Sequence, residues 1–167
     1  MERFEIRFRE GKEAIFDQDG NMVSPQWFDW IDRDGLLSGE SEYYLAKKDG
    51  KWAIFHRDGR QISNWYDDIL EDGLVKGQSN LYLAMRGKKG SMKALFHLDG
   101  RQLSGWYADI SREVLRGGQY FIAKRYLKIG FSRQKKYAVF DLRGNQISRW
   151  YDKIEADGLL KNVSDFF

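Results

Sequence analysis

The residues best suited to binding chemistry lie close together in the last third of the chain. Six cations fall within the thirteen residues from Lys124 to Lys136, interleaved with aromatic and aliphatic side chains. Loops on a rigid scaffold often carry binding residues, and cations beside aromatics suit a single-stranded nucleic acid or an acidic protein surface. The candidate binding residues are therefore Lys124, Arg125, Tyr126, Lys128, Phe131, Arg133, Lys135 and Lys136.

Three interpretations of this segment remain open. It can be an elongated hairpin whose aromatic side chains fold back on a neighbouring unit while its charges are solvated. It can instead bind a protein partner, or a nucleic acid or phosphate group. The structural interpretation is favoured over the protein partner, and the protein partner over the nucleic acid.

No pattern in the chain indicates an enzyme. The sequence contains no glycine-rich phosphate loop, no nucleophile elbow and no His-Glu-x-x-His phrase. It also contains no cysteine, which excludes a disulfide framework and a thiolate metal site. We therefore predict a protein without catalytic residues, cofactor or metal.

The two histidines are the remaining metal-ligand candidates. His56 and His97 occupy equivalent places in a repeated pattern, where the other copies have Asp17 and Asp141. Such a column could face a shared ion. The hairpin register derived below places it on the side away from the phenylalanines, which would be the solvent side. We therefore expect an exposed polar row and no metal site.

One pattern is written four times along the chain. The copies begin at Ala14, Ala53, Ala94 and Ala138, at intervals of 39, 41 and 44 residues. Each has an Ala-aliphatic-Phe triplet, a turn dipeptide ending in glycine, a serine, a Trp-aromatic pair and an isoleucine. A period of this size indicates a repeat architecture, in which units stack because one alone cannot bury its apolar face.

Each copy is predicted to form antiparallel hairpins. Asp58-Gly59 reads as a two-residue turn that places Phe55 opposite Ile62, and Asp49-Gly50 as another that places Tyr44 opposite Phe55. Each unit is then a meander of at least three strands. In the fourth copy the segment from Tyr126 to Lys136 stands in place of Asp49-Gly50, as an insertion.

The predicted fold is a single all-β domain spanning residues 1–167. It is an array of four antiparallel β-meander repeats of about 40 residues, with units of approximately 1–38, 39–77, 78–118 and 119–167. In the first strand, Glu5 and Arg7 replace the aromatic and alanine of the other copies. A polar outer face suits the end of an open stack. We therefore favour an open solenoid-like stack over a small closed β-propeller.

Two further columns are interpreted structurally. A large side chain that recurs once per unit usually fills the seam between units, although stacked indoles could also form a ligand-binding stripe. This column comprises Trp27, Trp65, Trp106 and Trp150. Aspartates two residues after three of these tryptophans are expected to be turn or strand-end residues that bond nearby backbone amides, not catalytic acids. They are Asp29, Asp67 and Asp152.

The second copy resembles a known repeat family. Gly50-Lys51-Trp52-Ala53 is similar to the Gly-Lys-Trp-Gly phrase of bacterial WG (KWG) repeats, and the Asp58-Gly59, Tyr66-Asp67 and Gly73-Leu74 pairs resemble further landmarks of that family. Alanine replaces the family's second glycine, and the tryptophan of the phrase occurs only in this copy. The resemblance implies a β-rich bacterial repeat used as a binding or accessory module, without family-wide catalytic residues.

Charge and hydropathy complete the expectation. The formal net charge is +3, with both signs interspersed through most of the chain, and no run approaches the 18 apolar residues of a membrane span. No signal peptide is recognisable, so we expect a cytoplasmic protein without a membrane partner. The predicted function is a non-enzymatic protein-interaction or scaffold module with an unidentified protein partner. The alternative is nucleotide or nucleic-acid binding through the basic Lys124–Lys136 loop.

Overall fold

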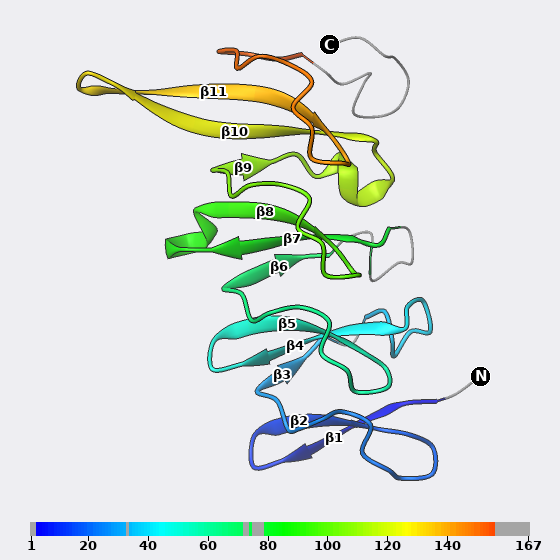
Figure 1. The fold of residues 1–167 in the computed structure, drawn as a ribbon. Helices are drawn as coiled ribbons and strands as arrows, with labels where there is room; N and C mark the ends of the chain where they lie inside the picture. Colours follow the sequence, from blue (N-terminus) through cyan, green and yellow to red (C-terminus); the bar gives the residue numbers. More distant parts are fainter. Residues whose placement is uncertain (1–2, 33, 72–73, 75–78, 156–167) are drawn as a thin grey trace.

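The computed structural model describes residues 3–32, 34–71, 74 and 79–155 of the chain. These residues form an all-β structure of several small antiparallel sheets, none of them closed. The described part contains no α-helix, and accordingly no helix long and apolar enough to cross a membrane. Figure 1 shows the sheets lying one above another in the order of the sequence. The all-β prediction is confirmed.

The strands of each sheet follow one another closely along the chain. The first sheet contains β1 (Glu5–Arg9) and β2 (Lys12–Phe16), and the second β3 (Trp30–Ile31), β4 (Tyr43–Lys48) and β5 (Lys51–His56). The third contains β6 (Asp68–Leu70), β7 (Leu81–Arg86) and β8 (Met92–His97), and the fourth β9 (Asp109–Ile110), β10 (Tyr120–Ile129) and β11 (Ser132–Asp141). Two short 3-10 turns, η1 (Lys88–Gly90) and η2 (Glu113–Arg116), lie in connections.

The short strands β3, β6 and β9 join consecutive copies of the repeated pattern. Each ends one copy and pairs with the first long strand of the next, so that the isoleucine column meets an alanine column. The pairs are Ile31 with Ala46, Ile69 with Ala84, and Ile110 with Ala123. Each three-stranded sheet therefore combines residues of two copies, and backbone hydrogen bonds link neighbouring units in addition to side-chain packing.

The turn at Asp49-Gly50 has the geometry predicted from the sequence. The φ angles of its two residues are 51° and 76°, as a primed two-residue turn requires. The register that follows places Tyr44 opposite Phe55 and Ala46 opposite Ala53, which confirms the prediction for this hairpin.

The turn at Asp58-Gly59 differs from the prediction. Only Gly59 has a positive φ, of 89°, while the N–H groups of His56 and Gly59 bond the carbonyls of Arg60 and His56, each at 2.9 Å. The loop therefore has three residues, a turn followed by a left-handed glycine, as in a common bulged hairpin. The predicted register is wrong by one residue, and Phe55 lies opposite Gln61.

The middle sheets are buried on both faces. In the second sheet, side chains of one face pack with the first sheet: Tyr44, Ala46, Ala53 and Phe55. Leu45 and Ile54, on the other face, pack with the third sheet. The core is therefore shared between neighbouring sheets. Burying one such aromatic side chain stabilises the fold by roughly 2–3 kcal/mol. The expectation that the side away from the phenylalanines faces solvent is therefore wrong.

The serine column satisfies buried backbone groups within each unit. Ser63 Oγ accepts the N–H of Ile54 at 2.8 Å and donates to the carbonyl of Asn64 at 2.9 Å. The equivalent serines accept the same bond in the other copies: Ser24, Ser104 and Ser148. The column therefore ties the second strand of each hairpin to the segment after the turn.

The tryptophan column lies at the seams between units. Trp65 packs against Phe55 of its own unit, with ring centroids 5.8 Å apart, and against Phe28 of the preceding unit at 6.4 Å. Trp106 makes the same pair of contacts with Phe96 and Tyr66. These half-buried indoles therefore support the seam interpretation over the ligand stripe.

Candidate functional site

The candidate segment is a long hairpin and not a loop. Strands β10 and β11 pair without interruption from Tyr120–Asp141 to Ile129–Ser132, and Gly130, with a φ of 61°, turns the chain. Figure 1 shows this hairpin projecting well beyond the edge of the other sheets. The predicted insertion therefore lengthens two strands of the fourth sheet.

The register defines the extent of the insertion. Arg125 pairs with Lys136 in the fourth sheet, as Lys48 pairs with Lys51 in the second. The residues without a counterpart are therefore Tyr126–Lys135, which we call the hairpin extension. The predicted boundary at Lys136 was one residue too long.

Three of the eight candidate residues lie at the base of the hairpin and have partners inside the chain. The Arg125 guanidinium lies 3.9 Å from the ring centroid of Trp150, and Lys136 Nζ lies 2.6 Å from Asp152 Oδ1. Lys124 Nζ lies 3.7 Å from Asp109 Oδ2. Lys124 therefore links two strands of the fourth sheet, while Arg125 and Lys136 contact the segment that follows β11.

Asp109 is the centre of charge at this base. Burial disfavours its ionised form, but a 2.6 Å hydrogen bond from Lys93, together with the charges of Lys93 and Lys124, keeps the pKa of Asp109 below its usual value. Asp109 therefore stays ionised and holds both lysines in place.

The other five candidate residues belong to the extension, where strand alternation separates them by character. Cross-strand partners share a face, so Tyr126 and Lys135 lie beside Lys128 and Arg133. The Arg133 guanidinium lies 5.0 Å from the ring centroid of Tyr126. We call this set, Tyr126, Lys128, Arg133 and Lys135, the cationic face.

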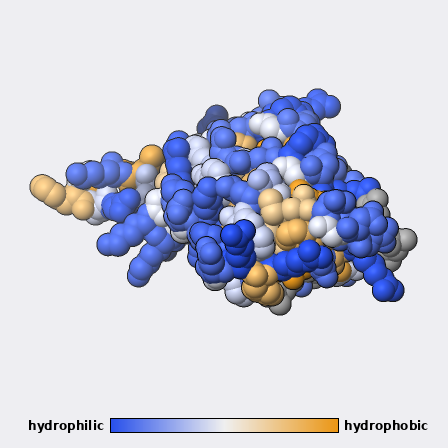
Figure 2. Space-filling view, turned by 90° about the horizontal axis from the view of Figure 1, so that it is seen from below, coloured by the Kyte–Doolittle hydropathy of each residue, from blue (hydrophilic) through white to orange (hydrophobic). Residues whose placement is uncertain are grey.

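The end of the hairpin is apolar, and the opposite face carries two aliphatic residues of β10 beside the polar Gln134 and Ser132 of β11. Leu127 and Ile129 alternate with the cationic residues, and Phe131 occupies the turn. Phe131 is fully exposed and Ile129 is 53% exposed. Figure 2 shows the hairpin as an arm that is hydrophobic at its end and hydrophilic behind it. We call Leu127, Ile129 and Phe131 the apolar tip.

These observations confirm one part of the structural interpretation of the segment and contradict another. The elongated hairpin is confirmed, but Phe131 does not fold back on a neighbouring unit. Sequence reasoning missed the separation of cations from apolar residues, although the alternation was visible once the segment was read as strands. The eight residues thus form two groups, a structural base and an exposed arm.

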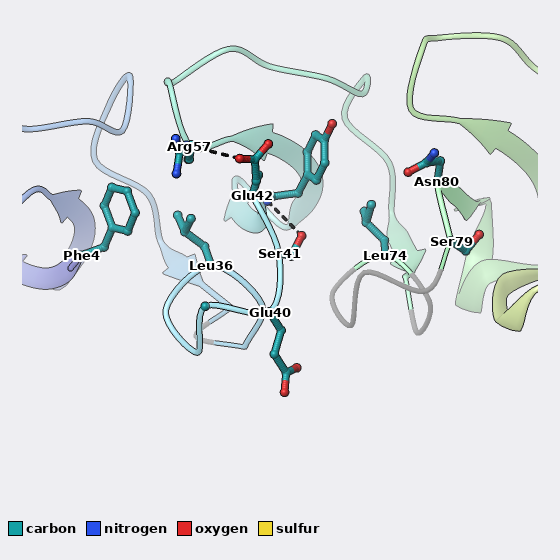
Figure 3. A pocket seen from close by; sticks show the side chains of 11 residues that line it. Phe4, Leu36, Glu40, Ser41, Glu42, Arg57, Leu74, Ser79 and Asn80 are labelled. Atoms are coloured by element: carbon teal, nitrogen blue, oxygen red, sulfur yellow. Dashed lines mark hydrogen bonds and ion pairs between the residues drawn. The ribbon is translucent and has the colours of Figure 1, made fainter. Parts of the chain in front are cut away.

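A hollow lies among the connections between strands (Figure 3). It has a volume of about 440 Å³, and its lining includes Phe4, Leu36 and Tyr43. Two of its three charged groups are paired, since Glu42 lies 3.8 Å from Arg57, and the third is Glu40. It is therefore a weaker candidate for a charged ligand than the hairpin.

The histidine column stabilises turns. The imidazole Nδ1 of His56 and that of His97 accept the N–H two residues later, at 3.4 and 3.1 Å. Asp17 and Asp141 use a carboxylate oxygen for the same bond. The side chain of His56 is only 16% exposed, so the predicted exposed row is wrong. Within the described ranges, no cluster of three or more potential ligands could hold a metal.

The first two members of the aspartate column bond backbone amides as predicted, but these amides lie 20 residues further along the chain and are not nearby ones. Asp29 accepts the N–H of Asp49, and Asp67 that of Gly87, each at 2.8 Å. Both bonds reach the turn of the following hairpin. The column is therefore part of the connection between units.

Comparison with known proteins assigns no family or function to the chain. A scan against family models and a search of curated proteins find no match to the chain. The resemblance to WG repeats therefore stays a prediction from the residues themselves.

Proposed function

We propose that the chain is a non-enzymatic protein-interaction module built as an open, solenoid-like stack of four WG-like repeats. Its binding element is the β10–β11 hairpin, which presents the apolar tip and the cationic face to a protein partner. The observation that carries this proposal is Phe131, fully exposed at the end of a hairpin.

The stack itself gives no reason for the extension. A two-residue turn suffices at Asp49-Gly50, where the strands have the same register. An exposed apolar side chain on a projecting arm adds nothing to the core, whereas aromatic anchors dominate binding energy in protein interfaces. The partner we infer has a pocket for Phe131 and acidic residues that meet Lys128, Arg133 and Lys135.

Substitution of the anchor tests the proposal. Phe131→Ser should abolish capture of the partner in a pull-down from extract of the native host, because it removes the central apolar contact. Phe8→Ser is the matched control, since Phe8 is also exposed, at 63%, but lies in β1 at the other end of the stack. Phe8→Ser should leave capture intact, and capture that survives Phe131→Ser would overturn the proposal.

A second candidate function rests on the cationic face. Tyr126 lies among Lys124, Arg133 and Lys135, and a ring between cations could stack a base while the cations bind phosphates. Binding of a single-stranded oligonucleotide, measured at low and moderate salt, separates the two functions. Affinity that falls steeply with salt would favour the nucleic acid, because phosphate binding releases counterions.

A further inference from the structure

The hairpin extension is a ribbon of two strands, so each of its strands has an outer edge. On the outer edge of β10, the short strand β9 pairs with Ala123 and Lys124 and no further. The chain before β9 leaves this edge for the third sheet, where Tyr107 pairs with Lys93 of β8. Figure 1 shows β10 continuing well beyond β9. Among the described residues, β10 therefore has no neighbouring strand on this edge from Tyr126 onward.

The backbone hydrogen bonds at the base show which residues direct their polar groups to this edge. The carbonyl of Lys124 accepts the N–H of Ala108 on the β9 side, at 2.9 Å. Alternate residues of a strand direct their N–H and C=O groups to the same side, so Tyr126 and Lys128 direct theirs away from β11 as well. Within the described chain these groups have no backbone partner. We call Tyr126–Ile129 the open edge.

In the second and third sheets a carboxylate closes the equivalent position. Asp29 accepts the N–H of Asp49, and Asp67 accepts that of Gly87, each at 2.8 Å. Each of these N–H groups belongs to the second residue beyond the one whose carbonyl bonds the aspartate backbone. In the fourth sheet the residue at this place is Tyr126.

The aspartate column is interrupted where the fourth sheet would need it. Ala108 follows Trp106 at the same distance as Asp67 follows Trp65, and its side chain has no acceptor for the N–H of Tyr126. Of the three-stranded sheets, the one that carries the projecting arm is therefore the one whose edge no column aspartate closes.

The two sides of the open edge differ in character. Tyr126 and Lys128 belong to the cationic face, while Leu127 and Ile129 lie on the other side. Lysines often protect an edge strand from unwanted pairing, but they do not explain aliphatic residues between them, and Ile129 is 53% exposed. The β11 strand of the extension is polar on both sides. Only a strand added beside β10 therefore gains both apolar contacts and cationic neighbours.

We propose that the open edge receives an extended segment of the partner protein as a further strand, antiparallel to β10 and in line with β9. Cross-strand neighbours share a face, so the residues opposite Tyr126 and Lys128 are acidic and those beside Leu127 and Ile129 are aliphatic. Main-chain hydrogen bonds provide the affinity of such strand addition, and alternate side chains its specificity. The proposal rests on the proposed interaction function and specifies how the partner binds.

A second copy of this chain does not suit the open edge. Antiparallel pairing of two β10 strands would join two cationic faces in one sheet, each with Lys128, Arg133 and Lys135. The hairpin extension contains no carboxylate that could offset this repulsion. Like charges on neighbouring strands destabilise their pairing, so the occupant is an acidic segment of a different protein.

A synthetic peptide tests the pairing on the full chain. The peptide has about six alternating glutamate and valine residues, the length of a typical strand. At saturation, hydrogen exchange at the Tyr126 and Lys128 amides should slow at least about tenfold relative to Leu127 and Ile129, whose amides already face β11. Contact through side chains alone would not produce this alternation.

Two N-methylated peptides of equal charge and composition are the matched controls. Methyl groups on the glutamate nitrogens remove the donors to the carbonyls of Tyr126 and Lys128, so binding should be lost. Methyl groups on the valine nitrogens face away from β10, so binding should persist.

Closing the edge from within the chain gives a second measurement. Ala108→Asp restores the carboxylate of the column, so it should protect the Tyr126 amide without peptide and weaken peptide binding at least about tenfold. Ala108→Asn supplies an uncharged acceptor and should act in the same direction. Weakening by the aspartate alone would indicate simple repulsion of the acidic peptide and would contradict the role given to Ala108.

Five outcomes overturn the proposal. They are no peptide binding, uniform protection along β10, protection of the Arg133 and Lys135 amides instead, equal binding of both methylated peptides, and open-edge amides already protected in the chain alone. Protection that grows with protein concentration would identify a second copy as the occupant. None of these outcomes depends on Phe131 or on capture of the natural partner, so failure here is distinguishable from failure of the proposed function.

Discussion

The hairpins β4–β5 and β10–β11 follow the same plan at their base. Both pair an alanine with an alanine and an aromatic with Phe55 or Phe140, and both pack these residues against the preceding sheet. The second sheet then turns at Asp49-Gly50, while the fourth continues through the hairpin extension. The comparison shows that stacking requires only the base of each hairpin and that the hairpin extension is additional to it.

The largest effect contrasts two phenylalanines. Phe55 is buried among Tyr44, Phe28 and Trp65, so Phe55→Ala should lower the free energy of unfolding by about 3–5 kcal/mol. Phe131→Ala should change it by less than about 0.5 kcal/mol, because the ring is fully exposed. Urea unfolding of both variants measures the contrast, and similar losses would contradict it.

A smaller effect is expected at the serine column. Ser63→Ala leaves the buried N–H of Ile54 without its 2.8 Å acceptor and should cost about 1–3 kcal/mol. Ser132→Ala, in the exposed hairpin extension, is the control and should be neutral. If thermal melts show no difference between the two variants, the serine column does not hold the hairpins as described.

These results set the limits of sequence-based prediction. The columns and the two-residue turn at Asp49-Gly50 were readable because alternation and turn chemistry agree there. Asp58-Gly59 was misread because an Asp-Gly pair serves two-residue and three-residue loops alike. The distinguishing signal was His56, whose Nδ1 accepts the N–H of Asp58 and favours the longer loop.

The strand pairing between successive copies could not be predicted from the sequence as well as the hairpins could. The pairing of Ile69 with Ala84 depends on the stacking of whole units, which a single copy does not reveal. For the candidate site, the sequence located the arm correctly but not its base. Arg125 contacts Trp150, and Lys136 contacts Asp152, only because the fold of the last unit brings these residues together.

Acid should weaken the stack through its turns. The hydrogen bond from the Arg60 side chain holds the pKa of Asp58 below its usual range, and the backbone N–H of Asn21 does the same for Asp17. A carboxyl whose pKa is lower in the folded state stabilises the fold above its unfolded pKa of about 3.9, and this stability is lost as pH falls through the folded pKa. The contribution of these two carboxyls to stability should therefore be fully present above about pH 5 and fall below about pH 4.

The hairpin extension provides the control for this pH dependence. It contains no carboxylate, so its removal should leave the acid transition unchanged. A shifted transition, followed by circular dichroism, would show that the arm contributes to the stability of the turns.

The smallest effect is expected from removing the extension itself. Replacing Tyr126–Lys135 by Asp-Gly reproduces the turn of β4–β5, and shortening a surface connection changes stability by only about 0.6 kcal/mol per halving. Shortening from ten residues to two corresponds to about 1.4 kcal/mol, so the variant should melt within about 6 °C of the full chain. A loss of several kcal/mol would place the apolar tip in the core.

Partner capture by that shortened chain is the most direct test of the central claim. Because Arg125, Lys136 and the end of the stack are retained, the variant differs from the full chain only in the arm. In a pull-down from native extract, the full chain should capture its partner and the equally stable shortened chain should not. Equal capture by both chains would contradict the assignment of the hairpin extension as the binding element.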